Sequence, residues 1–325
     1  MKTQRGIWAL FILLGLLPFC ILLSISVGTV SIHWHEVFGA VPGVSSTIVY
    51  ALRVPRCILA LMVGGGLALA GACYQGLLRN PLADPYVLGI SSGASLGAVI
   101  AALWMPAWLS PFAFAGALLT MLCVMALAGS GRGDTSVATL ILAGVIINAL
   151  FSAAVTFGML LLGESMTDVM FWLTGAIRPL SYAELGRLGI GWGALCLALG
   201  CYAPRLNVLL LGEEVARSLG LATERLRWQV FVLSSLLIGL LVSKSGIIGF
   251  VGLVVPHLVR LATGSDYRWL LPLSVLAGAE LVLLADILGR VLGGGEEFPI
   301  GVLMALLGAP FFLWLLWRRQ GQSYL

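Results

Sequence analysis

Ten long apolar runs, separated by short polar or Gly/Pro-rich segments, constrain this chain more than any other feature of its sequence. A helix needs about 20 mostly apolar residues to cross the hydrocarbon core of a bilayer, so each run is a candidate transmembrane helix. No alternation of apolar and polar residues, which a membrane barrel would require, competes with this interpretation. The sequence therefore predicts an all-α polytopic membrane protein with about ten transmembrane helices per subunit, over 6–28, 54–78, 86–104, 107–128, 137–162, 187–203, 227–243, 246–262, 269–288 and 299–317.

The composition leaves little room for anything besides these spans. Of the 325 residues, 60% are hydrophobic and only 10% are charged, whereas charged residues make up about 25% of an average soluble domain. We therefore expect one transmembrane domain over residues 1–325, with no soluble nucleotide-binding domain and no nucleic-acid partner. The first run exceeds the ~7–15 apolar residues of a signal peptide, which favours a retained first span.

The distribution of Lys and Arg predicts the orientation of the chain. With both termini in the cytoplasm, twelve of the 18 cations lie on cytoplasmic segments and six on the opposite side. Cytoplasmic loops of membrane proteins are enriched in Lys and Arg, so this assignment favours a multi-pass protein with both termini inside. The six cations predicted outside are Arg53, Arg56, Arg178, Arg187, Lys244 and Arg290.

The sequence contains no recognisable catalytic or metal-binding motif. Neither Lys2 nor Lys244 follows the glycine pattern of a P-loop, so we expect no ATP hydrolysis by that route and no enzymatic activity. The six cysteines form no CxxC pair, and we interpret them as small buried hydrophobes. His33 and His35 are weak candidates for a metal site, so we predict no metal and no resident cofactor.

Two acidic residues, Glu280 and Asp286, lie in or near the ninth run. Asp286 precedes Arg290 by four residues, which is the helical spacing of an ion pair, and we favour pairing over a proton relay. An ion-coupled transporter binds its protons or ions on buried ionisable residues, and this sequence offers few of them. An ion-gradient-driven secondary transporter of a small molecule is nevertheless one possible function of such a chain, and a membrane-embedded enzyme is another.

Residues 206–227, between the sixth and seventh runs, combine apolar and charged positions. Leu211 and Leu219 stand there among Glu213, Glu214 and Arg217. This pattern predicts short amphipathic helices in water, whose apolar face needs a surface to cover it. Because the charges are of mixed sign, we expect that surface to be a protein partner and not an anionic lipid surface.

Seven sequence blocks occur in order along the chain: RVPR (53–56), GGGLALAGACYQGLLRNPLADPYVLGISSGASLG (64–97), LILAGVIIN (140–148), LGEEVARSLG (211–220), IGFVGLVVPHLVRLATGSDYR (248–268), ADILGR (285–290) and FPIGVLMALLGAPFF (298–312). Together they resemble the FecCD or BtuC-like permease family of type II ABC importers, which carry iron-siderophores, haem or vitamin B12. The resemblance covers nearly the whole chain.

This resemblance implies a particular set of partners. A second copy of the chain would complete a homodimer in the cytoplasmic (inner) membrane, two cytoplasmic ATP-binding subunits would hold ATP and Mg, and a substrate-binding protein would deliver cargo from outside. The cargo would be a ferric siderophore, haem or cobalamin, and the sequence does not distinguish them. We place iron chelates first because they are the commonest cargo of such permeases.

The resemblance also assigns roles to residues. It implies a pathway lined by the fifth and tenth runs, and docking of the binding protein on the outside arginines Arg53, Arg56 and Arg290. Arg178 is a candidate for contact with an anionic cargo, with an interfacial anchor as the favoured alternative. The cytoplasmic gate would include Asn80, Leu82 and Ser136, and coupling to the ATPase would fall on Leu211, Gly212, Glu213, Glu214, Ala216, Arg217, Leu219 and Gly220.

Overall fold

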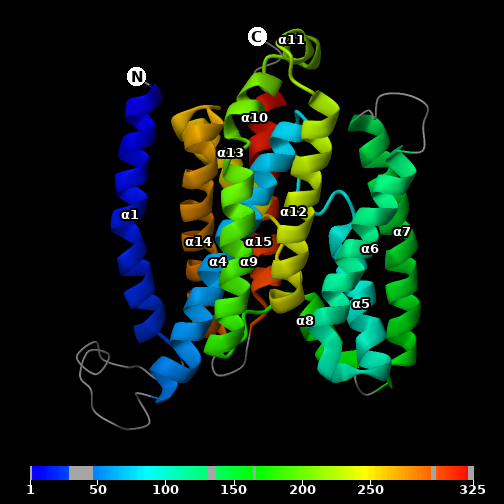
Figure 1. Ribbon diagram of the computed structural model, residues 1–325. Helices are drawn as coiled ribbons and strands as arrows, with labels where there is room; N and C mark the ends of the chain where they lie inside the picture. The colour runs from blue at the N-terminus through cyan, green and yellow to red at the C-terminus, as the bar shows by residue number, and fades with distance from the viewer. Residues whose placement is uncertain (1, 29–46, 130–136, 164–165, 294–297, 321–325) are drawn as a thin grey trace.

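The computed structural model describes residues 2–28, 47–129, 137–163, 166–293 and 298–320. In this part of the chain the helices stand together as a bundle (Figure 1). Each predicted run corresponds to one helix, which confirms the all-α prediction. These helices are α1 (Lys2–Ser26), α4 (Val54–Leu77), α5 (Ile90–Trp104), α6 (Leu109–Gly129), α7 (Val137–Leu161), α9 (Tyr182–Gly200), α12 (Thr223–Ser245), α13 (Val251–Thr263), α14 (Tyr267–Leu292) and α15 (Ile300–Gln320).

Not every helix is long enough to cross a bilayer alone. Within the described residues, six helices have the length and apolar character of a membrane span, and a seventh arises if α9 and the bent helix after it count together. Helices α5, α13 and the apolar part of α15 are shorter. The chain is thus a multi-pass membrane protein whose apolar helices differ in length.

Several short elements join these helices. A π-helix, η1 (Ile48–Arg53), leads directly into α4, and a 3-10 turn, η2 (Pro106–Trp108), leads into α6. Helix α8 (Met166–Leu173) was not predicted from the sequence. Helices α10 (Ala203–Leu209) and α11 (Glu213–Ser218) fall in or beside the amphipathic segment, where short helices were expected.

Helices α10 and α11 with the residues that join them to α12, 203–222, form a projection that we call the elbow. Figure 1 shows the elbow at the same end of the bundle as the start of α1 and the last turn of α15. We call this the elbow end, and the end that carries η1 and α8 the opposite end. Both described ends of the chain thus lie at one end of the bundle, as the prediction of ten spans requires.

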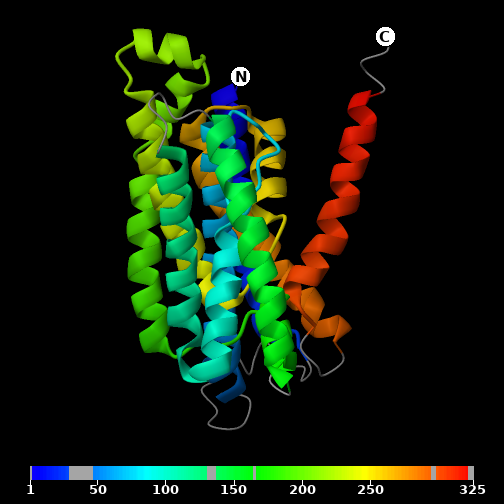
Figure 2. The ribbon, with the colours of Figure 1, turned by 90° about the vertical axis from the view of Figure 1, so that its right-hand side faces the viewer.

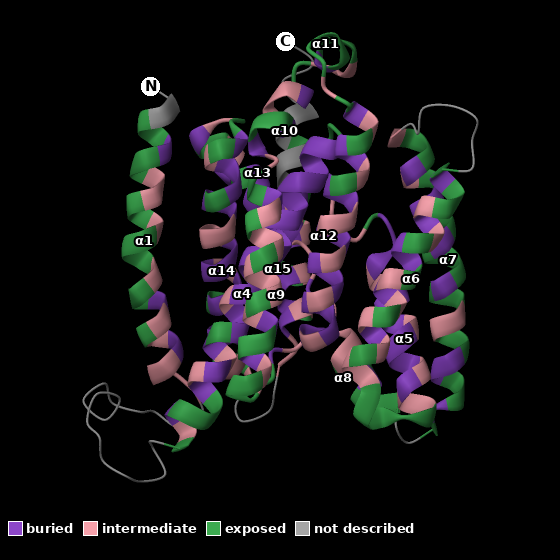
Figure 3. Cartoon of the chain, in the orientation of Figure 1, coloured by how far each residue is buried: buried purple, intermediate pink, exposed green. Residues whose placement is uncertain are grey.

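Helix α4 forms the centre of the bundle. Its span is 89% buried, whereas the span in α1 is only 11% buried, a contrast that is visible in the colours of Figure 3. Gly64 of α4 meets Gly278 of α14, and Gly71 of α4 meets Gly252 of α13, so closely that a Cβ atom at any of these positions would collide with backbone or neighbouring atoms. Small residues drive such close helix packing in membranes, which explains the glycines in α4.

A break between α12 and α13 fixes the start of α15. Residues 246–250 are not helical, and Phe250 has the left-handed φ of 66°. Three segments meet here, since the Ala176 N–H donates to the Ser245 carbonyl (2.8 Å) and the Gly301 N–H donates to the Gly175 carbonyl (3.3 Å). Unwound backbone at membrane depth needs such partners. The first turn of α15 is therefore held, while Figure 2 shows its other end standing apart from the bundle.

The prediction for the cysteines is only partly confirmed. All six lie in the described ranges and are free thiols, and Cys20, Cys57 and Cys73 are buried as expected. Cys201 is exposed, because it follows the last residue of α9 at the turn into α10. His33 and His35 lie outside the described residues.

Candidate functional site

The elbow is attached to α12 by a charged cluster. Glu213 Oε1 accepts hydrogen bonds from Arg217 Nη2 and Arg227 Nη2, both at 3.0 Å, and the Arg227 side chain is only 3% exposed. Partial burial by itself raises the pKa of the Glu213 carboxyl, but the charges and hydrogen bonds of Arg227 and Arg217 outweigh it and hold this pKa below its ordinary value. The carboxylate is therefore charged at neutral pH and links the start of α11 to α12.

A second attachment joins α10 to α14. Asn207 Nδ2 donates to Asp266 Oδ1 (2.6 Å), and the Tyr267 N–H donates to Asn207 Oδ1 (2.8 Å). Asp266 also caps α14 by accepting from the Arg268 N–H at 3.0 Å. The elbow thus contacts two long helices, α12 and α14, through specific polar groups.

The elbow exposes several large apolar side chains. Leu211 and Leu219 are 62% and 64% exposed, and Leu210 and Val215 are exposed as well, whereas Ala216 is fully buried. Gly212, with φ 110°, makes the turn into α11, which a side chain would strain. Four large exposed apolar side chains on a short projection form a surface suited to a protein partner.

Five of the predicted coupling residues therefore fall into two groups. Leu211, Leu219 and Glu214 face outward and are available to a partner. Ala216 and Glu213 face inward, so they hold the elbow in place. The sequence placed these residues on one segment, but only their contacts separate the two groups.

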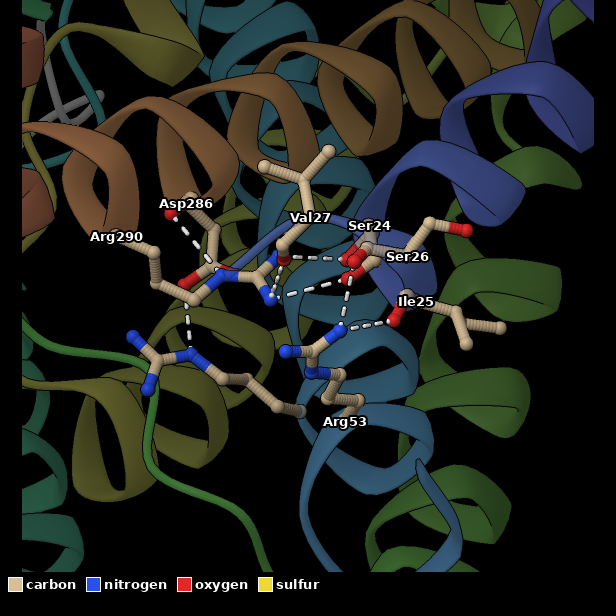
Figure 4. Close-up of polar contacts among 8 residues, drawn as sticks. Ser24, Ile25, Ser26, Val27, Arg53, Asp286 and Arg290 are labelled. Atoms are coloured by element: carbon tan, nitrogen blue, oxygen red, sulfur yellow. Dashed lines mark hydrogen bonds and ion pairs between the residues drawn. The ribbon is translucent and has the colours of Figure 1, made fainter. Parts of the chain in front are cut away.

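Two arginines at the opposite end bind the last turn of α1 (Figure 4). Arg53 Nη1 donates to the carbonyls of Ile25 (2.6 Å) and Ser26 (2.9 Å). Arg290 Nη1 donates to the carbonyls of Ser24 (3.0 Å) and Val27 (2.9 Å). The last four carbonyls of a helix have no partners within the helix, so the two guanidinium groups satisfy them.

Asp286 completes this arginine cluster, which comprises Arg53, Arg56, Asp286 and Arg290. The Asp286 side chain is fully buried, with Arg56 Nε at 2.9 Å from Oδ1 and Arg290 Nε at 3.1 Å from Oδ2. The predicted ion pair between Asp286 and Arg290 is confirmed, and Arg56 joins it from α4. One carboxylate thereby ties α14 to α4, and through Arg290 to α1.

Docking on these three arginines would be simplest if they were exposed, but they are largely buried. Arg53 is 6% exposed, and the side chains of Arg56 and Arg290 are 14% and 12% exposed. The α1 carbonyls and Asp286 attract the guanidinium groups inward, an effect that the positions along the sequence do not reveal. Among the described cations of this end, Arg178 and Arg187 are the exposed ones. Docking of a partner on the arginine cluster stays a prediction.

The candidate gate residues lie at both ends of the bundle. Asn80 and Leu82 form a turn after α4 at the elbow end, where the Leu82 N–H donates to Asn80 Oδ1 (3.0 Å). Arg178 lies in the segment between α8 and α9 at the opposite end. Ser136 lies outside the described residues. The structure therefore does not bring Arg178 together with the gate residues.

Comparison with known proteins gives consistent matches over nearly the whole chain. The sequence pattern of the FecCD transport family matches residues 16–318. The vitamin B12 import system permease protein BtuC of Vibrio cholerae is 39% identical over 98% of this chain and 96% of that protein. The hemin transport system permease protein HmuU of Yersinia pestis is 41% identical over 83% of each chain. A solved structure described as an inward-facing, metal-chelate type ABC transporter has a TM-score of 0.85 and 33% identity, covering 95% of this chain and 98% of that chain.

Proposed function

The chain belongs to the FecCD transport family, and we propose that it is the permease subunit of an ATP-driven importer that takes up a ferric siderophore, haem or cobalamin. Relatives of similar identity are named for vitamin B12 and for hemin. Because both cargoes are large, rigid chelates, we assign this class of molecule to the chain and not one member of it. The importer function also accounts for an elbow that requires a partner.

The elbow is the observation that carries this proposal. Two cytoplasmic ATP-binding subunits would cover Leu211 and Leu219, and their closure would displace the elbow. Its attachments at Glu213 and Asn207 would carry that movement into α12 and α14. ATP and Mg would stay on the ATPase chains, so this chain would act as one transmembrane domain with neither a cofactor nor an enzymatic activity of its own.

An ATPase that binds the elbow also fixes the orientation of the chain. We place the elbow end, with both termini, in the cytoplasm and the opposite end outside the cytoplasmic membrane. A second copy of the chain would pair along the pathway, with α7 and α15 lining it. Their large exposed apolar side chains favour this arrangement, and they include Leu150 and Phe157 on α7 and Leu306 and Leu313 on α15.

Proteoliposomes test the function directly. The permease is reconstituted with its ATPase, and the binding protein is added outside, loaded with the ligand that it retains on purification. We expect uptake that requires both ATP and the binding protein and that persists after ionophores collapse proton and sodium gradients. Uptake driven by an ion gradient without ATP would instead establish the secondary transporter.

Docking of the binding protein is tested by comparing arginines of the opposite end. Arg56→Gln leaves Asp286 paired with Arg290, and we expect it to slow association a few-fold at low salt, because charges at the edge of an interface mainly set the on-rate. Arg53→Gln is expected to release the end of α1, and Arg187→Gln serves as the exposed control. The measurement is surface plasmon resonance at two salt concentrations, and equal on-rates for Arg56→Gln and the parent protein would refute the docking role of Arg56.

A further inference from the structure

A basic pocket beside the elbow has no role in the function proposed above. Its volume is about 310 Å³, and Arg205 of α10, Arg225 of α12 and the linker residues 220–222 line it. Both arginines are exposed, and neither forms an ion pair with a carboxylate of the described ranges. The Arg205 guanidinium lies over the ring of Tyr202, 5.4 Å from its centre. Two arginines without a carboxylate partner among the described residues therefore line one hollow.

An apolar groove of about 340 Å³ adjoins this pocket. Tyr202, Trp228, Val232 and Leu233 line it, and Gln229 is common to the pocket and the groove. On α12 the positions 225, 228–229 and 232–233 recur at helical spacing, so they share one face of the helix. Along α12, with increasing distance from the elbow end, this face presents first the cation Arg225, then the aromatic ring of Trp228, and then the aliphatic side chains of Val232 and Leu233.

This order of side chains matches the layers of one bilayer leaflet. Helix α12 is one of the candidate spans, and Arg225 lies in its first turn. Lys and Arg at the ends of spans bind anionic headgroups, Trp and Tyr gather at the membrane interface, and aliphatic side chains contact acyl chains. Tyr202 and Trp228 therefore mark the interface, with Arg205 and Arg225 at the level of the headgroups.

We propose that the pocket and the groove together bind one anionic phospholipid from the leaflet at the elbow end. Its phosphate lies between Arg205 and Arg225, and an acyl chain follows the groove past Trp228 and Leu233. The groove lies at membrane depth, where a cytoplasmic protein does not reach, and an inorganic anion would leave it uncovered. This surface is distinct from the exposed Leu211 and Leu219, which flank α11 and do not line the pocket or the groove.

The site gives the lipid a direct contact with the elbow. Residues 220–222 form one wall of the pocket and are three of the four residues, 219–222, that connect α11 to α12. A headgroup in the pocket therefore holds this connection against Arg225. The inference stands independently of the imported cargo, because it depends only on the membrane and on the contacts of α10 and α12.

Native mass spectrometry of the full-length chain tests the site. The protein is released from nanodiscs that contain equal amounts of phosphatidylglycerol and phosphatidylcholine with identical acyl chains. We expect preferential retention of phosphatidylglycerol, and for Arg205→Gln/Arg225→Gln about 30-fold weaker retention with no change for phosphatidylcholine. Arg5→Gln/Arg268→Gln is the matched control, since it removes two exposed arginines from the same end outside the pocket.

A second variant separates the lipid from other occupants. Leu233→Trp fills the groove and leaves both arginines, and we expect it to reduce phosphatidylglycerol retention severalfold. Equal losses in the two double variants would overturn the site, because they would reflect net charge alone. The proposal also fails if inorganic phosphate displaces the lipid while Leu233→Trp has no effect, which would indicate an anion pocket. Displacement of the lipid on ATPase binding would likewise assign the pocket to the protein partner.

Discussion

Replacing Leu211 and Leu219 together with aspartate will reduce ATP-driven uptake at least about tenfold, while the permease still folds and enters the membrane. Both side chains are more than half exposed, so the fold loses little when they change. In the complex, however, two unpaired carboxylates would be buried against an apolar surface, and about 1.4 kcal/mol of lost binding energy is already tenfold in affinity. The measurements are copurification of the ATPase and uptake into proteoliposomes.

Two further variants separate the causes of this loss. Leu211→Ala/Leu219→Ala removes the apolar contact without adding charge and should give a smaller loss of uptake. Ser218→Asp adds charge at an exposed position of the elbow, next to Leu219, without removing an apolar group, and it should retain most of the activity. Normal ATPase binding and uptake by the double aspartate variant would exclude Leu211 and Leu219 from the coupling surface.

Replacing Asp286 with alanine will lower the free energy of unfolding by about 3–5 kcal/mol, because it leaves buried cations without their carboxylate. Arg56 and Arg290 both contact Asp286, and Arg290 also binds the end of α1. The loss should therefore loosen α1, α4 and α14 together. The measurement is denaturant unfolding of the purified permease in detergent, followed by intrinsic tryptophan fluorescence.

The control for this prediction is a more exposed ion pair at the same end of the bundle. Lys244→Ala removes the contact between Lys244 Nζ and Glu184 Oε1, which are 3.6 Å apart, and leaves the cap that Glu184 forms with Ser181. An exposed pair contributes at most about 1 kcal/mol, so we expect a small change. If Asp286→Ala is no more destabilising than Lys244→Ala, the arginine cluster does not hold these helices together.

The spans and the amphipathic elbow were predictable because their causes are local. A backbone in hydrocarbon must satisfy its own hydrogen bonds, so a long apolar run becomes a helix whatever surrounds it. Asp286 and Arg290 were likewise predictable, since four residues on one helix bring side chains together. The break before α13 was indicated by Gly246, Gly249 and Gly252. The sequence did not indicate which other segments contact this break.

The sequence by itself determined which segments enter the membrane and which one stays in water, because hydrophobicity acts on each segment separately. Only the tertiary structure decided which partners the charged side chains contact. Arg53 binds a carbonyl 28 residues away, and Arg56 meets a carboxylate 230 residues away. The pocket between Arg205 and Arg225 likewise exists only because α10 lies beside α12. Such contacts depend on how whole helices rotate and cross, and no single segment encodes that arrangement.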